Sequence, residues 1–226
     1  MTKTLRAVIF DLDGVITDTA EYHYLAWKAL AEDLGIPFTR GFNEELKGVS
    51  RMDSLEKILA RGGKQHDFSN EEKEKLADQK NRHYLMLIKN ITPSDILPGV
   101  KEFISEIKTR GIKIGLASAS KNAYQVMESL RMKDQFDAIV DARKIKNGKP
   151  DPEIFLAAAK LLQVEPDECI GIEDAAAGVE SIKRAGMFAV AIGAKENFPG
   201  ADLVYSSTAE LSFEKILEIY NKNLTQ

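Results

Sequence analysis

The chain begins with a short apolar run that predicts a buried β-strand. Residues 5–10 read Leu-Arg-Ala-Val-Ile-Phe, a brief stretch rich in aliphatic and β-branched side chains. Two acids and a glycine follow at once, in the sequence Asp11-Leu12-Asp13-Gly14. The first candidate chemical groups therefore come at the carboxyl end of the first expected strand.

Between residues 20 and 91 the apolar positions follow a helical period, and we expect no strand there. The first helix is expected to bury one apolar stripe: Leu25, Ala29, Leu30 and Leu34. Ser50 is placed to cap a second helix. Ser69 and Glu72 form a capping-box pattern that opens a third helix.

From residue 93 onward, helical patterns alternate with short apolar runs that predict strands. These strands are expected at four places: Ile112–Ala117, Ala138–Val140, Cys169–Ile172 and Phe188–Ile192. Apolar strands alternating with helices predict a parallel sheet covered on both faces. The expected fold class is α/β, a doubly wound, Rossmann-like parallel-sheet core of residues 1–17 and 92–226. Residues 18–91 are expected to form a small helical cap domain inserted into it.

Composition and charge restrict the partners more than the fold. The 226 residues carry a formal net charge of −4, which argues against general binding to nucleic acid or to anionic membranes. The single cysteine, Cys169, excludes an intramolecular disulfide and is typical of a cytoplasmic protein. The longest charge-free apolar stretch, residues 185–194, is too short to span a bilayer. We therefore expect a cytoplasmic protein with no nucleic-acid and no membrane partner.

Polar side chains directly follow three of the expected strands: Asp11, Asp13, Ser118, Glu173 and Asp174. In open α/β sheets the ligand site lies beyond the carboxyl ends of the strands, so these residues are expected to converge. Converging acids are costly without a cation, and carboxylate oxygens suit Mg²⁺. Ser118 and Lys149 would add a hydroxyl donor and a positive charge, a combination typical of phosphoryl-transfer sites.

Each of these features also has an ordinary structural interpretation. The sequence Asp11–Gly14 is a common turn signal, and acids at 173 and 174 would favour the start of a following helix. Ser118 could be a cap and Lys149 a solvated surface residue. The functional interpretation depends on all of them lying at the same end of one sheet.

Taken in order along the chain, these residues resemble the motif series of the haloacid dehalogenase superfamily: Phe10-Asp11-Leu12-Asp13-Gly14, Ser118, Lys149-Pro150 and Glu173-Asp174. The resemblance implies that Asp11 is a nucleophile that forms an aspartyl phosphate and that Asp13 is the general acid and base. It implies that Ser118 and Lys149 hold the phosphoryl group. It also implies a Mg²⁺ site of four acids: Asp11, Asp13, Glu173 and Asp174. The second acid, Asp13, argues against the haloalkanoate dehalogenases of the superfamily.

The insertion is more closely similar to the caps of the β-phosphoglucomutase family, at residues 14–23, 27–30 and 47–51, and residues 118–122 match as well. Asn147-Gly148 departs from the serine or alanine that many relatives carry before the lysine. The resemblance implies further substrate-binding or phosphate-binding residues: His23, Trp27, Gly48, Val49, Ser50, Arg51, Ser54, Lys80, Ala119, Ser120 and Asn122.

Two cations of the insertion stand out from the helical pattern. Lys80 falls on the apolar face of the third helix, where an ammonium is unusual, although a snorkelling stem would explain it. Arg51 follows Ser50 in a first helical turn, where a phosphate is favoured by the main-chain N–H groups and by the guanidinium. A solvent-exposed arginine is the ordinary alternative. His23 fits a proton relay or a plain helix-face position, and Trp27 fits packing better than substrate contact.

The family resemblance implies conversion of β-D-glucose 1-phosphate to glucose 6-phosphate through β-D-glucose 1,6-bisphosphate, which primes the enzyme. Such a reaction needs two phosphate sites, one at Asp11 with Mg²⁺ and one at Arg51 for the phosphate that is not reacting. The expected partners are small-molecule sugar phosphates, and we expect a monomer. A sugar-phosphate phosphatase of the same superfamily is the nearest alternative. A phosphorylation-switched binding module is a more distant one, disfavoured by the long helical insertion and the acidic pair at 173 and 174.

Overall fold

The computed structural model describes residues 4–46 and 49–223 and forms two compact units. The first, here called the core unit, comprises Met1–Asp18 and Thr92–Gln226. The second, here called the inserted unit, comprises Thr19–Ile91. No helix among the described residues is long and apolar enough to cross a membrane.

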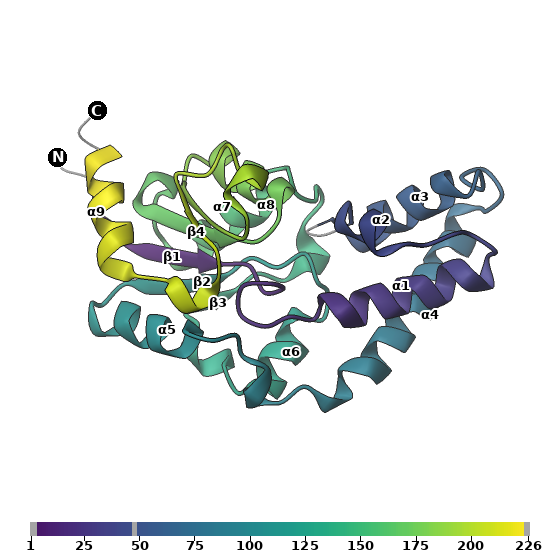
Figure 1. Ribbon diagram of the computed structural model, residues 1–226, viewed down its shortest axis with the longest axis horizontal. Coiled ribbons are helices and arrows are strands. Elements are labelled where there is room, and N and C mark those ends of the chain that lie inside the picture. The colour runs from purple at the N-terminus through teal and green to yellow at the C-terminus, as the bar shows by residue number, and fades with distance from the viewer. Residues whose placement is uncertain (1–3, 47–48, 224–226) are drawn as a thin grey trace. The chain divides into compact units, whose positions relative to one another are not determined.

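A six-stranded sheet in the order β3-β2-β1-β4-β5-β6 forms the centre of the core unit (Figure 1). Its strands are β1 (Ala7–Phe10), β2 (Lys113–Leu116), β3 (Ala138–Ile139), β4 (Cys169–Glu173), β5 (Phe188–Ile192) and β6 (Leu203–Tyr205). Every neighbouring pair is parallel. This is the strand order of a doubly wound, Rossmann-like sheet, so the predicted fold class is confirmed.

Helices cover both faces of this sheet (Figure 1). The core unit contains α5 (Val100–Thr109), α6 (Ala123–Ser129), α7 (Glu153–Leu162), α8 (Ala176–Arg184) and α9 (Phe213–Asn223). Alternate residues of a strand point to opposite faces, and Ile9 packs with the buried side chains of α7 and α8. Phe10 points the other way and meets Phe103 of α5 edge-on at 6.0 Å between ring centroids. Phe103 in turn contacts Phe213 of α9.

The four strands predicted after residue 93 are present, but β6 and α9 were not predicted. β6 has only three residues and lies at an edge of the sheet, where Leu203 and Val204 are half-exposed. Such a short, partly solvated strand carries almost no pattern of its own. α9 did carry a signal, since its buried residues Phe213, Ile216 and Tyr220 recur at helical spacing.

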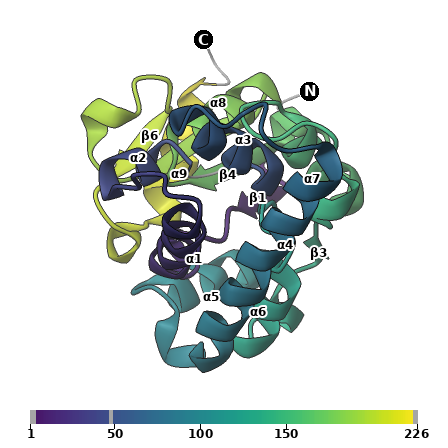
Figure 2. The ribbon, with the colours of Figure 1, turned by 90° about the vertical axis from the view of Figure 1, so that its right-hand side faces the viewer.

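Helices are the only regular secondary structure among the described residues of the inserted unit, as predicted. It contains α1 (Ala20–Asp33), α2 (Arg40–Glu44), α3 (Arg51–Arg61) and α4 (Asn70–Leu87). α4 packs against both α1 and α3 (Figure 2). The predicted caps are confirmed, because the Ser50 hydroxyl accepts the N–H of Asp53 and Ser69 forms a capping box with Glu72. α2 was not predicted, since its five residues are too few to show a period.

The predicted buried stripe of α1 is only partly correct. Leu30 is 2% exposed as expected and Ala29 and Leu34 are half-buried, but Leu25 is 37% exposed. The buried face passes through Tyr24 and Trp27 instead, which are 9% and 3% exposed. These two aromatic residues set the orientation of α1 because they bury more apolar area than a leucine does.

Two matched substitutions in α1 test this orientation. We expect Leu30→Ala to lower the free energy of unfolding of the inserted unit by about 2–5 kcal/mol, because it leaves a cavity in a packed interior. Leu25→Ala should lower it by less than about 1 kcal/mol, because little area is lost there. Urea unfolding followed by the fluorescence of Trp27, the single tryptophan of the chain, measures both. Equal losses would contradict the orientation.

Candidate active site

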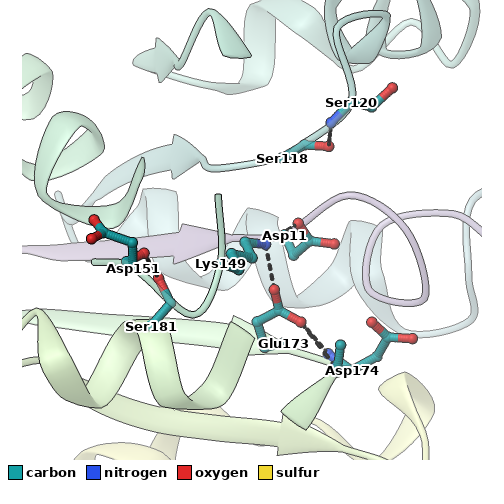
Figure 3. A network of polar contacts seen from close by, with 9 residues as sticks. Asp11, Ser118, Ser120, Lys149, Asp151, Glu173, Asp174 and Ser181 are labelled. Carbon is teal, nitrogen blue, oxygen red and sulfur yellow. Dashed lines mark hydrogen bonds and ion pairs between the residues drawn. The ribbon is translucent and has the colours of Figure 1, made fainter. Parts of the chain in front are cut away.

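The order in which strands are added to the sheet reverses between β1 and β4, and the acidic residues lie at the carboxyl ends of these two strands. After β1 it builds β2 and β3 on one side and then returns to build β4 on the other. Phe10 pairs with Ile172, so Asp11 lies beside Glu173, the last residue of β4 (Figure 3). Asp174 follows directly. Ligands bind at such switch points in open α/β sheets, and the predicted convergence is observed for Asp11, Glu173 and Asp174.

Lys149 joins this group as a buried ion pair. Its ammonium donates to Asp11 Oδ1 at 2.6 Å and to Glu173 Oε1 (Figure 3). The Lys149 side chain is 0% exposed, and its ammonium lies 5.2 Å from the centre of the Phe155 ring. The alternative of a solvated surface lysine is therefore wrong. The sequence placed Lys149 at this site but did not reveal its pairing, because Lys149 follows no strand and lies in the irregular segment before α7.

Burial and charge act in opposite directions on the ionisable groups of this cluster. Burial alone would lower the pKa of Lys149, but the charges of Asp11 and Glu173 and the hydrogen bonds to them raise it above its ordinary value. Burial raises the pKa of Glu173, and the Lys149 ammonium opposes that rise. Glu173 Oε2 also accepts the main-chain N–H groups of Asp174 and Ala175, each at 3.0 Å. The lysine thus stays a cation and holds both carboxylates.

Three carboxylates come close enough to hold one metal ion. Asp11, Glu173 and Asp174 each offer an oxygen, and these oxygens lie within 4.8 Å of one another. Hard oxygen donors of this kind suit a divalent cation such as Mg²⁺, and a carboxylate that accepts a hydrogen bond keeps further lone pairs. These residues therefore fit a metal. Asp13 was predicted as a fourth ligand, but it is not a member of this three-carboxylate group, and its metal contact stays a prediction.

Two glycines leave room for the acidic side chains. Gly14 has φ +73°, and a Cβ there would overlap the Asp174 carboxylate. Gly178, in the first turn of α8, lies so close to Glu173 that an added Cβ would occupy the place of its carboxylate. The packing of α8 on β4 therefore requires a residue without a side chain at position 178.

The polar segment after β2 forms a tight turn. Ser118 is 2% exposed, and its Oγ accepts the N–H of Ser120 at 3.1 Å. The Oγ of Ser120 accepts the N–H of Asn122 at 3.3 Å. Ala119 and Asn122 are half-buried. Because the Ser118 oxygen acts as an acceptor here, its hydroxyl proton can be donated to a phosphoryl oxygen.

A separate polar cluster lies within the inserted unit. Lys80 is 3% exposed, its Nζ lies 2.7 Å from His23 Nδ1, and it faces the rings of Trp27 and Tyr84. A snorkelling stem does not describe so buried a residue. An ammonium can only donate, so Nδ1 accepts and the ring proton belongs on Nε2. Burial, followed by the charges of Lys80 and Arg51, lowers the pKa of His23 well below its usual range and keeps the ring neutral.

Arg51 is the first residue of α3, and its charge acts on His23 of this cluster. Its Nη2 donates to Asn81 Oδ1 at 2.9 Å, and its Nη1 lies 3.9 Å from the exposed Asp78. The Arg51 side chain is 15% exposed, so the alternative of a fully solvated arginine is wrong.

The remaining predicted residues of the insertion differ in burial. Ser54 is 2% exposed, while Val49 and Ser50 are half-buried. Gly48 lies outside the described residues. Sequence reasoning missed Asn81, whose position one residue after Lys80 carries no signal of its own.

The fold and the site define a class of phosphoryl-transfer protein, and the family model of haloacid dehalogenase-like hydrolases matches residues 5–186. The chain belongs to this family. It is 53% identical over 214 residues to the β-phosphoglucomutase of Bacillus subtilis, and this alignment covers 95% of each chain. It is 34% identical to the phosphorylated carbohydrates phosphatase of Thermotoga maritima, over 81% of this chain and 82% of that protein.

A solved structure gives the same result. The crystal structure of β-phosphoglucomutase from Clostridium difficile superposes with a TM-score of 0.97 at 53% identity, over 99% of this chain and 100% of that one. The predicted resemblance to β-phosphoglucomutases is therefore confirmed over the whole length of the chain.

Gly178→Ala tests how the packing of α8 shapes the metal site. The added Cβ must displace the Glu173 carboxylate, so we expect the affinity for Mg²⁺ to fall about 10- to 100-fold. Isothermal titration calorimetry of the metal-free protein measures this. Gly200→Ala is the matched control, because a Cβ at position 200 meets nothing within 4 Å. An unchanged affinity in Gly178→Ala would show that Glu173 does not help to hold the metal.

Proposed function

We propose that this enzyme interconverts β-D-glucose 1-phosphate and glucose 6-phosphate. The proposal includes an aspartyl phosphate on Asp11 and β-D-glucose 1,6-bisphosphate as the priming intermediate. The observation that carries it is the Asp11–Lys149–Glu173 cluster in a chain 53% identical to a β-phosphoglucomutase over almost its full length. The monomeric state, the cytoplasmic location and the absence of nucleic-acid partners stay predictions.

Asp11 is the proposed nucleophile. The Lys149 ammonium holds Oδ1 of Asp11, which leaves Oδ2 to attack the phosphorus atom. The bond from Asp11 to phosphorus forms as the bond from phosphorus to the sugar oxygen breaks. Ser118 and Lys149 bind the phosphoryl oxygens. A Mg²⁺ ion bound by Asp11, Asp13, Glu173 and Asp174 would neutralise charge on the transferring group.

Asp13 is the proposed general acid and base. It gives a proton to the sugar oxygen that leaves when Asp11 is phosphorylated. In the second half-reaction it takes the proton of the other sugar hydroxyl, which attacks the aspartyl phosphate and releases Asp11 as a carboxylate. Proton transfer of this kind typically accelerates a reaction about 10²–10⁴-fold.

Arg51 is proposed to hold the phosphate that is not reacting. Removing a phosphoryl group from a monophosphate at Asp11 does not require a second cationic site, whereas a bisphosphate that binds in two orientations does. Two positive charges within the inserted unit, on Lys80 and on Arg51, support an anion-binding role, because arginine and lysine form charge-assisted hydrogen bonds with phosphate oxygens. The other residues predicted to bind substrate or phosphate are His23, Trp27, Gly48, Val49, Ser50, Ser54, Ala119, Ser120 and Asn122.

A sugar-phosphate phosphatase is the second candidate, and the 34% identical Thermotoga relative favours it. Both reactions would pass through the same aspartyl phosphate. They differ in whether water or a sugar hydroxyl attacks it. The product therefore separates the two candidates.

The test follows glucose 6-phosphate and free phosphate together, with β-D-glucose 1-phosphate, Mg²⁺ and a trace of bisphosphate. A charge-assisted contact from arginine to phosphate contributes about 1.5–3 kcal/mol, so Arg51→Ala should slow formation of glucose 6-phosphate by about 10- to 150-fold. Release of free phosphate from the phosphoenzyme should change far less, because water needs no arginine. Arg82→Ala, which removes an exposed arginine of α4, is the control. Free phosphate as the main product of the wild type would favour the phosphatase instead.

A further inference from the structure

We propose that Glu153 is a positioning residue for Lys149. Its carboxylate fixes the segment before Lys149, so that the ammonium is held between Asp11 and Glu173. The inference rests on the proposed function only in giving Lys149 a part in phosphoryl transfer. Nothing in the sequence pattern suggested it, because Glu153 appears there as an ordinary acid in the first turn of a helix.

The two carboxylate oxygens of Glu153 bind two successive main-chain N–H groups. Oε1 accepts the N–H of Lys146 at 2.9 Å, and Oε2 accepts the N–H of Asn147 at 2.8 Å. These hydrogen bonds lower the pKa of Glu153, so it stays a carboxylate and the bonds stay charge-assisted. They end two residues before Lys149 and therefore fix the direction in which the chain approaches the site.

The segment after Lys149 is anchored as well. Ser181 of α8 is fully buried, and its hydroxyl donates to the carbonyl oxygen of Asp151 at 2.7 Å (Figure 3). The N–H of Asp151 donates to the carbonyl of Gly148 at 3.0 Å. Asp151 Oδ1 accepts the N–H of Glu153 at 2.9 Å. Lys149 is thus held between two anchored segments, and Glu153 supplies the side-chain contacts to the earlier one, at Lys146 and Asn147.

Anchoring matters because a lysine side chain is a flexible stem that carries a point charge. Its ammonium stays at one position only if the backbone that carries it is fixed. A displaced ammonium would leave the buried carboxylates of Asp11 and Glu173 without their cation, which is strongly unfavourable. A role for Glu153 limited to starting α7 would instead affect the helix without changing the environment of Lys149.

Chemical labelling of lysines separates these two roles in the full-length protein. An acetylating N-hydroxysuccinimide ester reacts with accessible amines, and mass spectrometry gives the rate at each lysine. Lys149 should react far more slowly than Lys146 and Lys160, which are exposed and serve as internal references. Cys169, buried in β4, is labelled in parallel with a thiol reagent to report any opening of the sheet.

In Glu153→Gln we expect acetylation of Lys149 to accelerate about tenfold or more, the factor that loss of a charge-assisted hydrogen bond implies. Labelling of Cys169 should not change, and kcat should fall by about tenfold, as for other supporting partners of a catalytic group. Glu153→Asp keeps the carboxylate and should restore part of the protection of Lys149 and part of kcat. Glu210→Gln is the matched control, since Glu210 accepts the N–H and the hydroxyl of Ser206 elsewhere in the core unit. It should leave Lys149 and turnover as in the wild type.

Three outcomes are decisive. Unchanged protection of Lys149 in Glu153→Gln would overturn the proposal whatever the activity. Equal acceleration at Lys149 and Cys169 would also overturn it, because the variant would then loosen the unit as a whole. Faster acetylation of Lys149 alone, with unchanged turnover, would support the anchoring by Glu153 and contradict the part given to Lys149 in the proposed function.

Discussion

The buried ammonium of Lys149 between Asp11 and Glu173 is the interaction on which the rest of the site depends. Two carboxylates and a lysine buried at the carboxyl ends of β1 and β4 are stable only if each charge keeps its partner. The surrounding chain is arranged to maintain these pairs. Main-chain N–H groups hold Glu173, and a glycine at 178 leaves room for its carboxylate. Removing any of these contacts would leave a buried charge without a partner and so destabilise the site.

The same cluster explains why one fold can serve both a mutase and a phosphatase. A carboxylate nucleophile, a fixed ammonium and acids for a metal suffice to take a phosphoryl group from an ester. What happens next depends on whether water or a sugar hydroxyl reaches the aspartyl phosphate. We propose that the polar cluster of the inserted unit, with Arg51 and Lys80, makes that selection.

Local patterns predicted most of the core unit and the acids of the site. Asp11, Glu173 and Asp174 follow strands, and the carboxyl ends of parallel strands meet at one edge, so their convergence could be predicted from spacing. The burial of Lys149 could not, because Lys149 follows no strand and lies in the irregular segment before α7. The face of α1 was misassigned at Leu25, since packing of Tyr24 and Trp27 decides it. The anchoring of Lys149 by Glu153 joins a loop to a helix start, and no periodic pattern reports such a contact.

The most direct test of the account is the position of the transferred phosphoryl group. The full-length enzyme with Mg²⁺ is mixed with radiolabelled β-D-glucose 1,6-bisphosphate, quenched in acid and digested, and the labelled peptide is sequenced by mass spectrometry. We expect an acid-stable label on Asp11 that hydroxylamine removes, as expected of an acyl phosphate, and no label in Asp11→Asn. A label on Ser118 or another residue, or an equal label in Asp11→Asn, would contradict it.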